Sequence, residues 1–236
     1  MANAQVFAVW PEAGSPVSVA TFAREVNALA RVSLAPPPFP DDAARGAGQP
    51  IIVLPGFCAP EFSTARLRQF LKRQGFAVAS WNCGTNYGPT RTAFAYFERR
   101  LMDMCERHGR TVSLVGLSLG GTMAREMAKR HPGCVARIVT LGSPIRIPVP
   151  SPLAPLAQFA AWSWEPRARA DLRSVAEPPP VPVTAVVSPI DGVVDWRACV
   201  AAAAPHVETV TIESHHMTMG SNPAVQRLVA SRLAAT

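Results

Sequence analysis

The chain has 236 residues, of which 48% are hydrophobic and 17% are charged, a composition typical of a globular domain. Its net charge of +7 invites a nucleic-acid interpretation, but no run of Lys and Arg is longer than a pair such as Arg99-Arg100. Aromatic residues are few and do not alternate with the basic ones as a base-stacking surface requires. We therefore expect no nucleic-acid binding.

The cysteines and the apolar runs indicate the compartment. Five cysteines are widely spaced without a CxxC pair, which argues against a disulfide scaffold and against a zinc site. Cys58 and Cys83 each follow a predicted strand, but the sequence leaves open whether they pair. The N-terminus lacks a positive stretch and its apolar run ends at Pro11, so we expect no signal peptide. No window approaches about 18 uninterrupted apolar residues, so we expect a cytoplasmic protein without membrane insertion.

Proline-rich stretches mark the boundaries along the chain. Residues 1–49 form an N-terminal segment with one predicted helix, 19–32, in which Phe22, Val26, Leu29 and Ala30 recur at helical spacing. Prolines 36–40 end this segment, because proline neither donates to a ladder nor fits inside a helix. The remaining residues, 50–236, form the predicted main domain.

From Pro50 onward, predicted strands and helices alternate. Apolar runs predict strands at 51–54, 76–81, 111–115, 138–141, 183–187 and 207–212. Helical periodicity predicts helices at 63–74, at 92–108 and at 224–233. A further helical pattern follows Gly121, with Met123 and Met127 on one side. Such alternation is typical of an α/β fold with a mostly parallel, doubly wound sheet flanked by helices.

The stretch from Gly116 to Gly121 reads Gly-Leu-Ser-Leu-Gly-Gly and joins a predicted strand to a predicted helix. This is the context of a nucleophile elbow, in which a sharp turn forces a serine into strained backbone angles and exposes its hydroxyl. Strand and helix then come so close that there is no room for a Cβ atom two residues on either side of the serine, and Gly116 and Gly120 meet that need. Ser118 is therefore the candidate nucleophile.

A serine hydroxyl needs a base within hydrogen-bond reach, and that base needs an orienting acid. In elbow enzymes the acid follows the serine in the chain and the histidine comes last. Asp191 follows the strand 183–187, at the sheet edge where α/β proteins place their sites. Asp195 is its competitor, but it precedes a helical run and is typical of an N-cap.

The candidate bases are His215 and His216, after the last predicted strand. His206 precedes that strand and lies at the wrong end of the sheet. Alternation points one of the two adjacent histidines at the site, and we prefer His216. The oxyanion of the tetrahedral intermediate also needs amide donors. We expect these from Leu119, directly after the serine, and from Phe57, after the turn at Gly56.

Residues 50–236 resemble α/β-hydrolases of the lipase and esterase type. The resemblance rests on IIVLPGF, WNCGTNYGP, VGLSLGG, SPIDGVVDW and HMTMGSNP. It implies Ser118 as nucleophile, Asp191 and His216 as its partners, and the Phe57 and Leu119 amides as the oxyanion hole. It also favours His216, which aligns with the histidine that lies a few residues before the Gly-x-Asn-Pro of this loop in the family. The oxyanion loop departs from the pattern, because it begins Pro-Gly where many members have His-Gly.

The segment 145–180 is far longer than a typical connection between a strand and the next, and it is rich in proline and apolar residues. In this superfamily such an interval holds the cap over the site. We predict a small lid in which Phe159 and Trp162 contact the acyl chain of the substrate. The alternative is that the segment only covers the outer face of the sheet.

The sequence thus predicts a serine hydrolase that cleaves small-molecule carboxylic esters through an acyl-enzyme. It needs no metal and no organic cofactor. An acyltransferase or thioesterase with the same Ser-His-Asp triad is one alternative, and a non-catalytic interaction protein with this fold is another. The natural substrate and the oligomeric state stay open.

Overall fold

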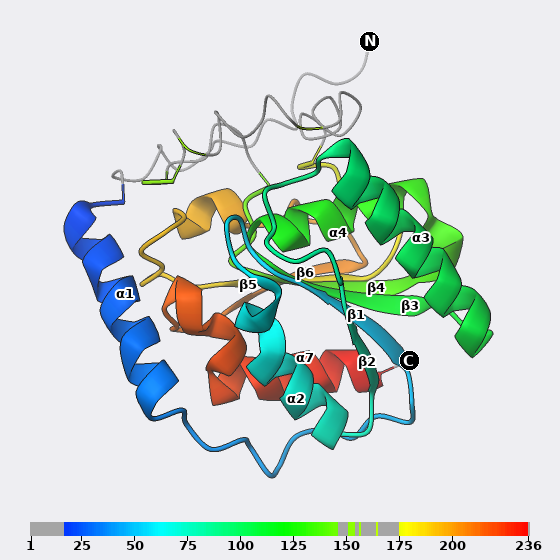
Figure 1. Ribbon diagram of the computed structural model, residues 1–236, viewed down its shortest axis with the longest axis horizontal. Coiled ribbons are helices and arrows are strands. Elements are labelled where there is room, and N and C mark those ends of the chain that lie inside the picture. The colour runs from blue at the N-terminus through cyan, green and yellow to red at the C-terminus, as the bar shows by residue number, and fades with distance from the viewer. Residues whose placement is uncertain (1–16, 146–150, 154–155, 157–163, 165–174, 236) are drawn as a thin grey trace.

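Within the part of the chain that the structure describes, six parallel strands form one sheet in the order β2-β1-β3-β4-β5-β6 (Figure 1). The structure is a computed structural model and describes residues 17–145, 151–153, 156, 164 and 175–235. The strand bounds are Pro50–Leu54 (β1), Ala77–Ser80 (β2), Val112–Leu117 (β3), Val135–Leu141 (β4), Val183–Val187 (β5) and Val207–Thr211 (β6). Each strand expected from the apolar runs is present.

Helices cover both faces of the sheet. In Figure 1, α3 and α4 lie on one face, and α2 and α7 lie on the other. The helix bounds are Val19–Leu34 (α1), Ala65–Arg73 (α2), Arg91–His108 (α3), Leu119–Arg130 (α4) and Pro223–Ala234 (α7). Short 3-10 helices lie at Glu61–Thr64 (η1), Pro132–Cys134 (η2), Trp196–Cys199 (η5) and His216–Ser221 (η6). The predicted helix 63–74 is therefore split, because its first residues form the end of η1.

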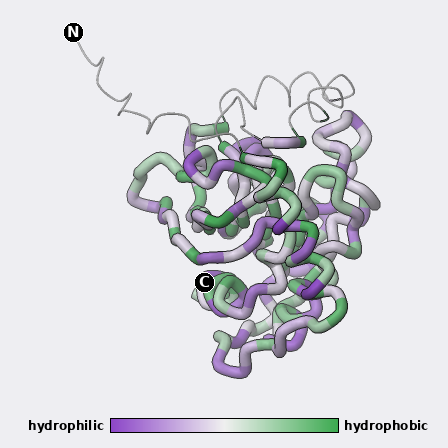
Figure 2. Tube along the Cα trace, turned by 90° about the vertical axis from the view of Figure 1, so that its left-hand side faces the viewer, coloured by the Kyte–Doolittle hydropathy of each residue, from purple (hydrophilic) through white to green (hydrophobic). Residues whose placement is uncertain are grey.

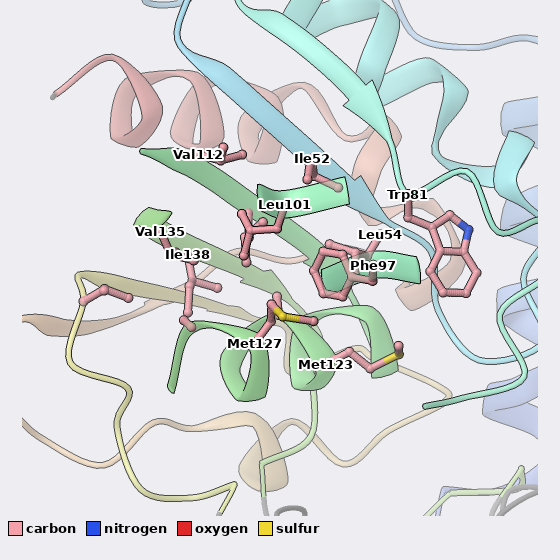
Figure 3. Packing of buried hydrophobic residues seen from close by; sticks show 14 of the residues in the cluster. Ile52, Leu54, Trp81, Phe97, Leu101, Val112, Met123, Met127, Val135 and Ile138 are labelled. Atoms are coloured by element: carbon pink, nitrogen blue, oxygen red, sulfur yellow. The ribbon is translucent and has the colours of Figure 1, made fainter. Parts of the chain in front are cut away.

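The strands β1, β3 and β5 are buried on both faces, which explains why they are continuous apolar runs rather than alternating ones, whereas the edge strands β2 and β6 are only partly buried. One buried cluster joins the sheet to α3 and α4, and Figure 3 shows its side chains converging from Phe97, Leu101, Met123 and Met127 onto Ile52, Leu54, Val112 and Ile138. A second cluster joins the opposite face to α2 and α7, with Leu67, Phe70, Val225 and Val229 among its members. The two clusters hold the sheet rigid under its carboxyl edge.

The strand order reverses direction between β1 and β3, which are neighbours although β2 comes between them in the chain. In open α/β sheets, ligands bind at the carboxyl ends of the strands beside this switch point. The loop after β1 carries Gly56 and Phe57, and the turn after β3 carries Ser118. The fold therefore brings these two segments to the same edge.

Helix α1 runs beside η6 at the far end of the sheet (Figure 1). It begins at its N-cap Ser18, whose hydroxyl accepts the Thr21 amide at 3.1 Å. The periodicity predicted this helix, but Val26 and Leu29 are 50% and 42% exposed, whereas Glu25 is 0% exposed. The buried face of α1 is thus centred on a carboxylate rather than on an apolar stripe.

Hydrophilic and hydrophobic residues are mixed along the described trace (Figure 2). No helix in the described part of the chain combines the length and the apolar character needed to cross a bilayer.

Candidate active site

Ser118 stands at the turn between β3 and α4 in a conformation that L-residues rarely adopt. Its φ is 49° and its ψ is −126°. The turn is fixed on both sides, because the Ser118 amide donates to the Leu141 carbonyl at 2.8 Å and the Ser118 carbonyl accepts the Gly121 amide at 2.9 Å. Backbone strain of this kind persists only where the surroundings determine it, and it is common at active sites.

The glycines around Ser118 are required by close backbone contacts. A Cβ atom on Gly116 would lie 2.3 Å from the Cα atom of Gly121, and one on Gly120 would lie 2.5 Å from the Pro55 carbonyl oxygen. Neither position can hold a side chain without displacing backbone. The crowding predicted from the Gly-x-Ser-x-Gly pattern is therefore present.

The loop after β1 lies against the serine. A Cβ atom on Gly56 would lie 3.2 Å from the Ser118 Cβ atom and 3.9 Å from its hydroxyl oxygen. Phe57 follows Gly56 on this loop, and Leu119 is the first residue of α4, at the positive end of the helix dipole. Within the described residues, neither of these two amides donates to another group. Both are thus available to an acceptor beside the serine.

Asn86 holds this loop in place, a role that the sequence reasoning missed. Its side-chain amide donates to the Pro55 carbonyl at 2.7 Å, and its backbone carbonyl accepts the Cys58 amide at 2.7 Å. Its side-chain oxygen accepts the Gly88 amide at 2.9 Å, and the residue is completely buried. Asn86 therefore brackets Gly56 and Phe57 from both ends. The signal was a polar residue within WNCGTNYGP, but polarity alone does not distinguish it from Asn82.

Asp191 and His216 form a hydrogen-bonded pair at the same edge. The Nδ1 atom of His216 lies 2.6 Å from Oδ2 of Asp191, and their side chains are 10% and 1% exposed. The other carboxylate oxygen, Oδ1, accepts the amides of Val193 and Val194 at 2.9 and 2.8 Å. Because an ionised carboxylate can only accept, Nδ1 carries the proton and Nε2 is left as the acceptor.

Gly142 places this pair beside the turn of Ser118. It follows Leu141, whose carbonyl accepts the Ser118 amide, and its φ is 55°. A Cβ atom on Gly142 would lie 3.0 Å from both the Asp191 Oδ2 and the His216 Nδ1 atoms. Ser118 thus follows β3, Asp191 follows β5 and His216 follows β6, and Gly142 at the end of β4 lies between the serine turn and the pair.

The surroundings of His216 act on its pKa in opposite directions. Burial alone would lower that pKa, but the charge and hydrogen bond of Asp191, together with the charge of Glu25, outweigh burial and raise it above the ordinary value. The nearby Cys199 thiol has its pKa raised by burial and by the charges of Asp191 and Asp195, so it stays protonated. The pair is therefore arranged to favour an imidazolium.

The competing residues lie elsewhere. Asp195 caps η5, where its side chain accepts the Arg197 amide at 3.0 Å. His215 faces α1, with Nδ1 at 3.5 Å from the Glu25 Oε1 atom, and this nitrogen makes no hydrogen bond to any described residue. His206 contacts the Pro179 carbonyl at 3.0 Å, at the amino end of the sheet. The structure joins Asp191 to His216 by a hydrogen bond, and the described residues show no such bond from Asp195, His215 or His206 to either member of that pair.

Phe159 and Trp162, which the sequence places in the lid, lie outside the described residues. Two described parts of the segment 145–180 reach opposite sides of the site. Leu153 and Met217 pack against the buried cluster that includes Val193 and Val194 of the acid loop (residues 188–196), and the Trp164 indole nitrogen donates to the Tyr87 carbonyl at 2.8 Å. The segment therefore has attachments on both flanks of Ser118.

The cysteines and the acidic residues bear on two other kinds of site, a disulfide and a metal centre. All five cysteines are free, so Cys58 and Cys83 do not pair in this structure. Among the described residues, no group of three His, Cys, Asp or Glu side chains is placed to hold a metal ion.

Comparison with known proteins finds one matching family and many solved structures with a similar fold. The family described as "Alpha/beta hydrolase family" matches residues 51–235. The comparison with curated proteins finds no match.

Among solved structures, the chain is 17% identical to one from a study of LipS and LipT, two metagenome-derived lipolytic enzymes, with a TM-score of 0.58 and coverage of 82% of this chain and 96% of that one. It is 17% identical to a putative aryl esterase from Burkholderia cenocepacia, with a TM-score of 0.56 and coverage of 81% and 92%. It is 16% identical to the Bacillus licheniformis lipase BlEst2, with a TM-score of 0.59 and coverage of 83% and 96%. At these identities the likeness concerns the fold.

Proposed function

Because this chain belongs to the Alpha/beta hydrolase family, we propose that it is a serine hydrolase that cleaves carboxylic esters of small molecules. The observation that carries the proposal is the hydrogen bond of 2.6 Å between His216 and Asp191 beside the strained turn of Ser118. A serine on such a turn, with a base oriented by a buried acid, is the arrangement that nucleophilic acyl transfer requires. The lipolytic enzymes and esterases among the structural neighbours support the same reaction class.

In the proposed reaction, the Nε2 atom of His216 takes the hydroxyl proton as Ser118 attacks the ester carbonyl. Asp191 keeps the imidazole in the tautomer with Nδ1–H and stabilises the imidazolium that forms. The amides of Phe57 and Leu119 donate to the developing oxyanion, and the imidazolium then protonates the leaving alcohol. Water attacks the acyl-enzyme in the same way and releases the carboxylic acid.

We place the acyl pocket under the segment 145–180, with Phe159 and Trp162 in contact with the acyl chain. The attachments of Leu153 and Trp164 on the two flanks of the site support a segment that spans it. An apolar lining suits short to medium acyl chains, which bind by burying their methylene groups.

The test is a chain-length series of nitrophenyl esters from acetate to decanoate, with the carboxylic acid measured as product. We expect hydrolysis by the wild type, and we expect Phe159→Ala and Trp162→Ala to raise KM for butyrate and hexanoate while leaving acetate nearly unchanged. Equal effects on all chain lengths would assign the segment to structural cover. Acyl transfer to an added alcohol or thiol in preference to water would assign an acyltransferase, and faster cleavage of matched thioesters would assign a thioesterase.

A further inference from the structure

Glu25 is a buried carboxylate in α1, outside the residues that the proposed reaction uses. It is 0% exposed, and it is the residue of α1 whose burial is complete. A carboxylate removed from water is unfavourable unless hydrogen bonds or opposite charges replace its hydration. The contacts that replace hydration at Glu25 therefore indicate what this residue does.

The two carboxylate oxygens of Glu25 bind two different loops. Oε1 accepts the amide of Gly192 at 2.7 Å, and Oε2 accepts the amide of Met217 at 3.0 Å. Gly192 directly follows Asp191, and Met217 directly follows His216. One side chain from the N-terminal segment thus ties together the backbone next to both members of the hydrogen-bonded pair.

Local packing allows this close approach. A Cβ atom on Gly192 would lie 2.6 Å from the Thr21 carbonyl oxygen and 2.8 Å from Cγ of Glu25, so a larger residue would push α1 away. Phe22, one turn before Glu25, packs with Met217 against the cluster formed by Val187, Val193, Val194, Ala198 and Cys199. The carboxylate is therefore held at a fixed distance from both loops.

We propose that Glu25 is a positioning residue that sets the spacing of the acid loop and the base loop (residues 216–223) and thereby the hydrogen bond between Asp191 and His216. Its effect on turnover rests on the proposed ester hydrolysis, whereas its effect on the hydrogen bond does not. Glu25 contacts neither the substrate nor the hydroxyl of Ser118 in this role. It acts through the two backbone amides.

The charge of Glu25 adds a second effect on His216. The titratable groups around this imidazole are Asp191 from the acid loop, Glu25 from α1, and His215 and Cys199 beside them. The negative charges of Asp191 and Glu25 both raise the pKa of His216 and oppose its burial. Removing the charge of Glu25 therefore lowers that pKa and makes the imidazolium less stable.

The test compares Glu25→Gln with Val229→Ala in the full chain. Glutamine has the shape of glutamate, but only its carbonyl oxygen accepts from a backbone N–H, whereas its NH2 group is a donor, so one of the two loops loses its hydrogen bond. We expect kcat for a nitrophenyl ester to fall about 10²-fold with KM nearly unchanged, because small displacements of catalytic groups have effects of this size. We also expect the acid limb of the profile of kcat/KM against pH to move to lower pH. Val229 is buried in the cluster of α2 and α7 and is not a member of the cluster that contains Phe22 and Met217, so we expect Val229→Ala to lower stability without these changes.

A second readout does not depend on activity. The proton shared between His216 Nδ1 and Asp191 Oδ2 gives a strongly deshielded ¹H NMR resonance, which we expect in the wild type and in Val229→Ala, but shifted or broadened in Glu25→Gln. If Glu25→Gln fails to fold, Glu25→Asp takes its place. It keeps the charge but is one methylene too short to reach both amides, and we expect kcat to fall about 10-fold.

The two proposals fail in different ways. A wild type that shows the resonance but hydrolyses no ester would overturn the proposed function. The positioning role of Glu25 would then still be tested by comparing the resonance of Glu25→Gln with that of the wild type. An unchanged resonance in Glu25→Gln, or a kcat equal to that of Val229→Ala, would overturn the positioning role while leaving ester hydrolysis intact.

Discussion

The Oδ2 atom of Asp191 lies 2.6 Å from Nδ1 of His216, and the residues that hold this contact come from three distant parts of the chain. Asp191 is fixed by the amides of Val193 and Val194, and both loops are tied to Glu25. The pair is thus positioned by backbone hydrogen bonds rather than by side-chain packing alone.

The first prediction separates the pair from its neighbours in the chain. We expect Asp191→Asn and His216→Ala to lower kcat about 10³-fold or more, through loss of tautomer control and loss of the base. Asp195→Asn and His215→Ala serve as matched controls, and we expect far smaller changes in kcat. Asp195→Asn should also change the free energy of unfolding little, because asparagine can cap η5 through the same side-chain oxygen. Larger losses in the controls than in the pair would reassign the acid and the base.

The second prediction concerns pH. The pKa of His216 is raised in the folded protein, and the base must be neutral, so kcat/KM should rise with pH through a pKa above about 6.5. In Asp191→Asn the raising influence is lost and burial remains, so the residual activity should show its acid limb at lower pH. The raised pKa of His216 also makes the free energy of unfolding depend on pH. Protonated His216 stabilises the fold fully below its unfolded pKa, and this contribution disappears as pH rises through the folded pKa. An acid limb below about 6 in the wild type would contradict this account.

The third prediction concerns the loop that carries Phe57. Asn86→Ala removes the side-chain amide that donates to the Pro55 carbonyl and the side-chain oxygen that accepts the Gly88 amide. We therefore expect the free energy of unfolding to fall by about 1–3 kcal/mol. We also expect kcat to fall about 10²-fold or more, because the Phe57 amide loses its position. Asn82→Ala is the matched control, since its side chain donates to the exposed Tyr96 hydroxyl at 2.9 Å. Chemical denaturation and ester kinetics measure both effects, and similar kinetics in the two variants would remove Asn86 from the site.

The fourth prediction concerns the strain at Ser118. Its φ of 49° is unfavourable for any residue with a Cβ atom, and such strain costs about 1–3 kcal/mol. Glycine relieves the strain but loses about 0.5–1 kcal/mol through its flexible unfolded state. We therefore expect Ser118→Gly to be about 1 kcal/mol more stable than Ser118→Ala in urea denaturation. A less stable glycine variant would show that the turn is not strained.

Much of the fold follows from local patterns. The apolar runs of the strands and the glycines around Ser118 reflect requirements that act within a few residues, namely burial on both faces and the lack of room at Gly116 and Gly120. Asp191 was chosen over Asp195 by its place after a strand, which is also local. These features could be predicted because sequence neighbours create them.

The partners of Glu25 and Asn86 could not be predicted in this way. Glu25 binds amides 167 and 192 positions further along the chain, and backbone amides leave no mark in the sequence. The helical spacing of the apolar residues in α1 gives no indication that Glu25 is its buried residue, and Val26 and Leu29 are exposed. Asn86 has its partner Pro55 31 positions earlier. Buried polar contacts of this kind depend on the tertiary structure.

The most direct measurement is the labelling of the wild type and of Ser118→Ala with a fluorophosphonate, followed by mapping of the modified peptide. The Ser118 oxygen attacks phosphorus and displaces fluoride, so only a serine activated by its base reacts rapidly. We expect one label on Ser118 in the wild type, none in a correctly folded Ser118→Ala, and ester hydrolysis lost in parallel. A label on another residue, or near-normal ester hydrolysis by purified Ser118→Ala, would contradict Ser118 as the nucleophile.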